Sequence, residues 1–165
     1  MFEVHQSLPE GTLVQLINNN LIMSPSPLNV HQKVLDKIYR YIGDFVETNH
    51  LGETRVAPFD VYFDKKNVFQ PDVIFISNEN LHKIEANGLH GAPDLVVEIL
   101  SPSTAKYDLG KKKDVYENYG VKEYWIIDPS TKDVNGFASV NGVYEEFEKS
   151  NAVLFSRLLN TSFKF

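Results

Sequence analysis

The sequence predicts a mixed α/β fold in which one β-sheet is flanked by helices. Two segments, 29–49 and 104–120, repeat their apolar residues at helical spacing. Short apolar runs rich in β-branched residues lie between and after them, as is typical of strands. The order is therefore helix, three strands, helix and strand, which favours a single mixed sheet covered by helices, with a hairpin added at each end of the chain.

The composition is that of a globular protein and excludes several kinds of site. With 165 residues the chain has the length of one domain, which would span residues 1–165. The absence of cysteine excludes disulfide scaffolds, cysteine-ligated zinc, iron–sulfur clusters and cysteine nucleophiles. The net charge of −6 argues against nonspecific coating of nucleic acid, although it permits a local site.

The expected location is the cytoplasm. The first residues lack the basic region and apolar run of a signal peptide, and no stretch approaches the ~20 apolar residues of a membrane span. We therefore expect no membrane association.

The first predicted element is a β-hairpin. Apolar runs at 13–16 and 21–23 flank three asparagines at 18–20, and asparagine tolerates the left-handed backbone of tight turns. The segment Ser24–Pro27 contains two prolines, which fix φ and remove backbone donors. We expect this segment to be an extended loop.

The first helix is predicted to begin at Asn29, which can cap it while Gln32 reaches back in the manner of a capping box. His31 lies on the inward side of this helix, where we expect a hydrogen-bonded core histidine. The apolar stripe consists of Val34, Leu35, Ile38, Tyr41, Ile42 and Phe45.

Three adjacent strands are predicted at 54–63, 73–76 and 95–100, with a polar connection at 78–91 between the last two. A fourth strand, at 124–127, follows the second helix. Asn-Gly pairs at 135–136 and 141–142 then indicate the turns of a terminal hairpin, followed by a closing strand or helix.

Acidic residues interrupt these buried strands. Glu98 lies in an apolar run typical of a strand covered on both faces, where an isolated carboxylate requires a cation. Asp72 heads the strand at 73–76, and a neighbouring strand would bring it alongside Glu98. Asp94 shares the strand face of Glu98, but after Pro93 it more simply marks a turn at the start of the strand.

Lys112 is a cation that these acids could bind. At ~100° per residue it falls on the stripe of the second helix, which consists of Leu109, Val115, Tyr116 and Tyr119. Asp108, one turn earlier, shares this face and could orient the ammonium. The outward lysines, Lys106, Lys111 and Lys113, form either a DNA-facing rim or an ordinary solvated helix face.

Two acids and a lysine in this arrangement suit metal-dependent hydrolysis of phosphodiesters. Asp72 and Glu98 would hold Mg²⁺, with Mn²⁺ able to substitute, and would leave positions for a phosphate oxygen and a water. Lys112 would orient or deprotonate the water, or offset charge on the phosphorane. Because similar ion pairs occur in α/β domains without any catalytic role, the residues alone also permit a structural interpretation.

Several segments together resemble the Uma-type restriction endonuclease family: Met23–Pro27 with His31, Gln70–Val73, Gly91–Thr104, the series Asp108, Lys112 and Tyr116, and Gly120–Pro129. This family is placed in the PD-(D/E)xK nuclease superfamily, so the resemblance implies a restriction-endonuclease-like core. Asp72 matches the first acid of the superfamily and Glu98 the second. Leu100 stands where a lysine is usual, and the resemblance includes its replacement by Lys112 from the next helix.

The resemblance implies a Mg²⁺-dependent DNA endonuclease with Asp72, Glu98 and Lys112 as catalytic residues and DNA as its partner. A homodimer is a plausible addition, because cutting both strands of a duplex usually requires two active sites. The alternative is a nuclease-like fold that binds nucleic acid or protein without cleaving it.

Overall fold

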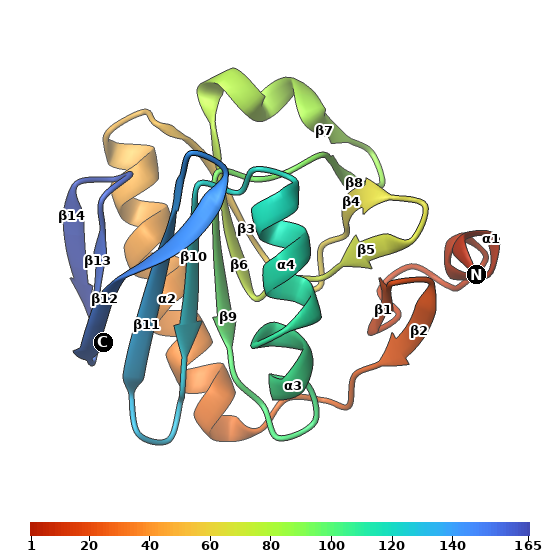
Figure 1. The fold of residues 1–165 in the computed structure, drawn as a ribbon, viewed down its shortest axis with the longest axis horizontal. Coiled ribbons are helices and arrows are strands. Elements are labelled where there is room, and N and C mark those ends of the chain that lie inside the picture. Colours follow the sequence, from red (N-terminus) through yellow and green to blue (C-terminus); the bar gives the residue numbers. More distant parts are fainter.

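The computed structural model describes residues 1–165, and it shows a central sheet with helices on both faces (Figure 1). The strands of this sheet are β3 (Gly52–Val56), β6 (Val73–Ser77), β9 (Leu95–Ile99), β10 (Glu123–Ile127), β11 (Asp133–Val140) and β12 (Val143–Asn151). They lie in the order β12-β11-β10-β9-β6-β3. Only β9 and β10 are parallel neighbours, so the sheet is mixed.

Two apolar cores lie on the two faces of this sheet. The long helix α2 (Asn29–Thr48) covers one face, and α3 (Ala105–Asp108) with α4 (Lys111–Asn118) covers the other (Figure 1). Side chains along a strand alternate between faces: Val97 of β9 packs in the core with α2, whereas Val96 packs in the core with α4. By the same alternation Glu98 faces α4.

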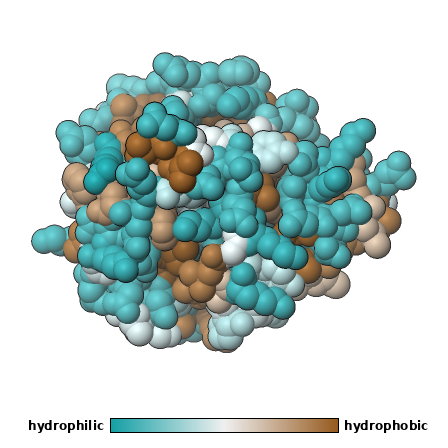
Figure 2. Space-filling view, in the orientation of Figure 1, coloured by the Kyte–Doolittle hydropathy of each residue, from teal (hydrophilic) through white to brown (hydrophobic).

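A second sheet packs against the core on the α4 side. Its strands are β1 (Val14–Ile17), β2 (Asn20–Met23), β4 (Val61–Asp64), β5 (Asn67–Phe69), β7 (Ile84–Glu85) and β8 (Gly88–His90), in the order β2-β1-β5-β4-β8-β7. The remaining elements are α1 (Phe2–Gln6), the 3₁₀ helix η1 (Asn78–Lys83) and a separate hairpin of β13 (Val153–Ser156) and β14 (Thr161–Lys164). The face shown in Figure 2 is mostly hydrophilic, with apolar atoms in small separate groups.

The predicted fold class is confirmed, and so are the N-terminal hairpin and the extent of the first helix. Asn18 and Asn19 take φ values of 48° and 63° at the tip of the β1–β2 hairpin, which is the left-handed turn expected of asparagine. The sequence predicts only a hairpin at this end of the chain. In the structure β1 also pairs with β5, so the hairpin is part of the second sheet.

The predicted capping box is wrong. Leu28 occupies the N-cap position of α2, and no side chain caps the helix. Leu28 directly follows Pro27 and has the extended backbone usual for an N-cap residue, at φ −71° and ψ 156°.

The predicted strand at 54–63 is two strands in different sheets. β3 ends at Val56, and the chain then passes through Pro58, which has no N–H to donate to a ladder. β4 begins at Val61 and pairs with β5 and β8 of the second sheet. The expectation that three strands lie side by side holds for β3, β6 and β9.

The predicted helix at 104–120 is broken at Leu109 and Gly110 into α3 and α4. Leu109 is therefore not on the inward stripe, and 57% of it is exposed, while Tyr119 is also exposed at the end of α4. Within α4, Lys112, Val115 and Tyr116 are buried, so the inward orientation of Lys112 is confirmed.

The predicted turn at Asn135–Gly136 is wrong, because both residues lie inside β11. Gly136 is required there because a Cβ would stand 2.5 Å from the Trp125 ring on β10. Asn141 and Gly142 do form the β11–β12 turn, with φ of 53° and 83°. No helix in the chain has the length and apolar character needed to span a membrane.

Candidate active site

Asp72 and Glu98 come together where β6 and β9 pair. The two strands are antiparallel with Val73 opposite Val97, and the same register continued by one residue places Asp72 opposite Glu98. Asp72 Oδ2 accepts a hydrogen bond of 2.7 Å from the Ile99 N–H, which fixes the carboxylate beside β9.

Glu98 is buried, and only one of its two carboxylate oxygens has partners. Its Oε1 accepts a hydrogen bond of 2.6 Å from the Tyr116 hydroxyl and also forms an ion pair with Lys112 Nζ. Both partners come from α4, which lies against the face of β9 that Glu98 occupies.

Lys112 is only 2% exposed and lies between two carboxylates. Its Nζ is 2.9 Å from Asp108 Oδ1 as well as in contact with Glu98. Asp108 is itself oriented by Thr104, whose hydroxyl donates to Oδ2 at 3.1 Å. The expectation that Asp108 orients the ammonium is confirmed.

The negative charge of this cluster exceeds what one lysine neutralises. Burial alone would lower the pKa of Lys112, but Asp108 and Glu98 outweigh it and raise that pKa above the usual value. Burial raises the pKa of Glu98, and Asp108 and Asp72 raise it further against the opposing effect of Lys112. An additional cation near Glu98 would therefore be stabilised.

His31 of α2 contacts the first acid. Its Nε2 is 3.3 Å from Asp72 Oδ2, and its Nδ1 is buried without a hydrogen-bond partner. Burial would lower the pKa of His31, but the interaction with Asp72 outweighs this and raises it. The sequence predicts a paired, inward histidine at this position, and the structure adds that its partner is Asp72.

One cavity of about 340 Å³ is lined by His31, Asp72, Glu98, Asp108 and Lys112. The loops at 24–28 and 101–104 form part of its wall, and the hydroxyl groups of Ser101 and Thr104 are 2.8 Å apart there. Thr104 is the N-cap residue of α3, but its side chain does not cap the helix. Gln15 and Gln70 also line the cavity, and sequence reasoning missed both.

The donor set fits a magnesium ion held by two carboxylates. Asp72 Oδ1 and Glu98 Oε2 accept no hydrogen bond, because the partners of both residues contact the other oxygen. No group of three or more His, Asp or Glu could hold a metal ion, so an ion here would have only the two carboxylates as protein ligands. Mg²⁺ commonly binds one or two carboxylates, keeps several waters and completes its coordination with substrate phosphate oxygens.

Asp94 lies at the other end of β9 and has a structural environment. Its carboxylate accepts from the Ser77 N–H at 2.7 Å and from the Asn80 side-chain amide at 3.0 and 2.9 Å, and it pairs with Lys122 Nζ at 2.7 Å. It does not line the cavity. Its predicted position at the turn that starts the strand is confirmed.

The outward lysines do not line this cavity either. Lys113 Nζ stands 3.9 Å from the Phe137 ring centroid, and Lys106 Nζ is 4.8 Å from that of Tyr107. Both therefore pack on aromatic rings, and Lys112 is the lysine that lines the cavity.

Comparisons with known proteins identify the family of the chain and support its fold. The family model Uma2, described as "Putative restriction endonuclease", matches residues 2–161. A crystal structure described as a putative nuclease belonging to DUF820, from Anabaena variabilis ATCC 29413, matches with a TM-score of 0.78 and 20% identity, covering 96% of this chain and 90% of that one. At that identity the likeness establishes the fold. No curated protein matches significantly.

Proposed function

The chain belongs to the Uma2 family of putative restriction endonucleases, and from this we propose that it is a Mg²⁺-dependent DNA endonuclease of the PD-(D/E)xK type. The observation on which the proposal rests is that Asp72 and Glu98 each have one carboxylate oxygen without a hydrogen-bond partner and that both line a cavity together with Lys112. Acids on paired strands with a cation beside them suit hydrolysis of a phosphodiester.

Asp72 Oδ1 and Glu98 Oε2 would hold Mg²⁺, or Mn²⁺ in its place, and the ion would neutralise the scissile phosphate and acidify a bound water. His31 keeps Asp72 in place from α2, and Tyr116 keeps Glu98 in place from α4. Both contacts reach the oxygens that the ion would not use, so metal binding leaves them intact.

Lys112 acts as a fixed positive charge. Its raised pKa keeps the ammonium protonated near neutral pH, so it does not serve as the base that deprotonates water. It orients Glu98 and offsets the negative charge that develops on the phosphorane. This role requires no lysine at position 100, where the chain has Leu100.

A second candidate function is DNA or protein binding without cleavage. The observation that favours it is the ion pair between Glu98 and Lys112, which already supplies Glu98 with a cation. In that case the acids would be structural, and removing Mg²⁺ would change nothing.

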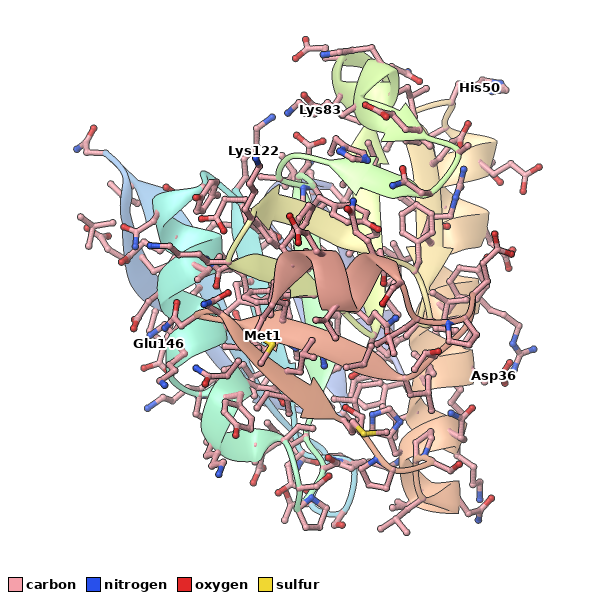
Figure 3. All side chains as sticks on the ribbon, turned by 90° about the vertical axis from the view of Figure 1, so that its right-hand side faces the viewer. Met1, Asp36, His50, Lys83, Lys122 and Glu146 are labelled. Atoms are coloured by element: carbon pink, nitrogen blue, oxygen red, sulfur yellow. The ribbon has the colours of Figure 1, made fainter.

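Cleavage of supercoiled plasmid tests the proposal. Purified protein with Mg²⁺ or Mn²⁺ is expected to nick or linearise the plasmid, and EDTA or Asp72→Asn is expected to abolish this. Asp36→Asn is the matched control, because Asp36 is an exposed acid on α2, away from the cavity (Figure 3). Linear product formed without a nicked intermediate would support a dimer with two sites. A folded protein that cleaves no DNA with either ion, or cleaves equally well in EDTA, would refute the proposal.

A further inference from the structure

Gln15 lies in the wall that the second sheet contributes to the candidate active-site cavity. It belongs to β1, on the α4 side of the central sheet (Figure 1), and only 7% of the residue is exposed. It lines the same cavity as Asp72, Glu98 and Lys112. Buried polar groups are nearly always hydrogen-bonded, so the amide of Gln15 needs partners either in the protein or in a ligand.

The oxygen of the Gln15 amide is fixed by the backbone. Its Oε1 accepts a hydrogen bond of 3.0 Å from the Gln70 N–H. Because a backbone N–H can only donate, the atom that faces it is the oxygen, and the amide cannot be turned over. Gln70 is also held, since its side-chain amide donates to the Thr12 carbonyl at 3.1 Å and to Asp60 Oδ1 at 2.8 Å. The NH₂ group of Gln15 therefore has one defined orientation.

This NH₂ group is a donor without a partner. The protein accepts no hydrogen bond from Gln15 Nε2, although its oxygen is bonded. His31 Nδ1 and Ser24 Oγ also lack partners, but those two atoms are sealed from solvent, whereas Gln15 Nε2 is not among the sealed atoms. Because Gln15 lines the cavity, a ligand in the cavity can reach its NH₂ group.

The other nitrogen-bearing side chains of the cavity are engaged with protein groups. Lys112 pairs with two carboxylates, His31 Nε2 contacts Asp72, and Gln70 donates to the two oxygens given above. The free group of Gln15 can only donate, so it suits an anionic oxygen and not a metal ion, which binds oxygen ligands. A phosphate among the acids of this cavity would require such a donor in addition to the metal ion.

We propose that Gln15 is a further catalytic residue, whose NH₂ group donates a hydrogen bond to a non-bridging oxygen of the scissile phosphate. This inference rests on the proposed nuclease function. The phosphate would then be contacted from β1 as well as from the central sheet and α4. A donor that is fixed before the reaction stabilises the charge that develops on this oxygen without having to reorient.

DNA binding with Ca²⁺ in place of Mg²⁺ tests the contact separately from cleavage. Gln15→Glu keeps an oxygen for the Gln70 N–H, and Gln15→Leu introduces no charge, so the two variants share only the loss of the NH₂ group. Both are expected to weaken binding of a labelled duplex about tenfold, measured by fluorescence anisotropy. Gln6→Glu is the charge-matched control, because Gln6 is exposed and lines a second cavity but not the first. It should bind like the wild type.

Cleavage of a duplex with one phosphorothioate bond tests which group the NH₂ contacts. The two diastereomers are cut separately with Mn²⁺, which tolerates sulfur as a ligand better than Mg²⁺ does. Sulfur accepts hydrogen bonds poorly, so the wild type and Gln6→Glu should cut one diastereomer about tenfold more slowly than the other. Both Gln15 variants should cut the two diastereomers at similar rates. A purely structural role of Gln15 would lower both rates and leave their ratio unchanged.

The outcomes separate this inference from the proposed function. Cleavage by the wild type with the same diastereomer ratio in both Gln15 variants would overturn the inference and leave the proposed function standing. Wild-type affinity for DNA in both variants would also overturn the inference. Weaker binding by both variants, with no cleavage by the wild type, would support the phosphate contact and refute hydrolysis. A wild type without affinity for any DNA would refute both.

Discussion

The two ends of strand β9 carry carboxylates on the same face in opposite situations. Asp94, at the start, receives hydrogen bonds from Ser77 and Asn80 and an ion pair from Lys122, so each of its oxygens has a partner. Glu98, one residue before the end, has partners on one oxygen only and lines a cavity. The comparison indicates that incomplete pairing, rather than burial, distinguishes the candidate site.

The pKa shifts of the two acids differ in the same way. Burial would raise the pKa of Asp94, but Lys122 and the hydrogen bonds from Ser77 and Asn80 outweigh it and lower that pKa. At Glu98 burial prevails, and the neighbouring acids add to it. Ionised Asp94 is therefore stabilised by the fold, whereas ionised Glu98 requires a further cation.

The largest expected difference in stability is between substitutions of Lys112 and of Lys122. Lys112→Met would leave Glu98 and Asp108 buried without their cation, which is expected to lower the free energy of unfolding by about 3–5 kcal/mol at neutral pH. Lys122→Met should cost much less, because the Lys122 side chain is 51% exposed and Asp94 keeps its other donors. Urea unfolding measures the free energy of unfolding of both variants. Plasmid cleavage per folded molecule should fall about 10²- to 10³-fold for Lys112→Met only, and equal effects of the two substitutions would contradict the comparison.

A divalent cation should stabilise one end of β9 and not the other. At a Ca²⁺ concentration about 100-fold above its dissociation constant, the melting temperature of the wild type should rise by roughly 5–10 °C. Asp72→Asn should remove the shift, and Asp94→Asn should keep it. Because the pKa of Glu98 is raised and the ion binds the carboxylate, the shift should grow from about pH 6 to about pH 9. A rise in melting temperature that does not depend on pH and that persists in Asp72→Asn would contradict this account.

The two acids should also contribute oppositely to the pH dependence of stability. The folded-state pKa of Asp94 is lowered. Its contribution to the free energy of unfolding is therefore present at pH values above the unfolded-state pKa and is lost as pH falls through the folded-state pKa. Asp94→Asn should thus cost about 1–3 kcal/mol at pH 7, with the difference shrinking below about pH 4. The folded-state pKa of Glu98 is raised. Its contribution to the free energy of unfolding is therefore present at acid pH and is lost as pH rises toward the folded-state pKa. Urea unfolding across pH measures both contributions, and a constant cost of Asp94→Asn would contradict the first.

The smallest predicted effect concerns His31. Its contact with Asp72 positions the metal-binding carboxylate, as the Asn80 amide positions Asp94. His31→Ala is expected to raise the Mg²⁺ concentration for half-maximal cleavage about tenfold. Gln32→Ala, exposed on the same turn of α2, is the control and should leave the Mg²⁺ requirement unchanged. If both variants behave like the wild type, His31 has no positioning role.

The positions of Glu98 and Lys112 were predictable because each is a charge in an apolar pattern. Lys112 shares its buried face with Val115 and Tyr116, three and four residues later, and this local spacing is preserved although the predicted helix is broken at Gly110. Asp72 was predicted at the head of a strand beside that of Glu98, and the structure shows that these two strands are antiparallel. Local patterns therefore predicted the positions of Glu98 and Lys112, whereas the position of Asp72 also depended on strand pairing.

The second sheet was not predictable in this way. β4, β5, β7 and β8 contain two to four residues each, too few to show a period, and their pairing joins distant parts of the chain. Gln15 and Gln70 reach the cavity through the contact of β1 with β5, which only tertiary structure reveals.

Glu123 shows why a buried acid alone does not identify a site. It lies in β10 and accepts hydrogen bonds from the Trp125 indole at 3.2 Å, the Ser156 hydroxyl at 2.7 Å and the Leu158 N–H at 2.6 Å. Like Asp94, it has partners on both oxygens and is not among the residues lining the first cavity. The same criterion that selects Glu98 therefore sets Glu123 aside.

The most direct test of this account is plasmid cleavage by Glu98→Gln and Asp94→Asn, measured side by side at equal concentrations of folded protein with Mg²⁺. We predict that Glu98→Gln loses cleavage by about 10²-fold or more, while Asp94→Asn, though less stable, cleaves within a few-fold of the wild type. Cleavage retained by Glu98→Gln, or lost equally in both variants, would contradict the assignment of the active site to the Glu98 end of β9.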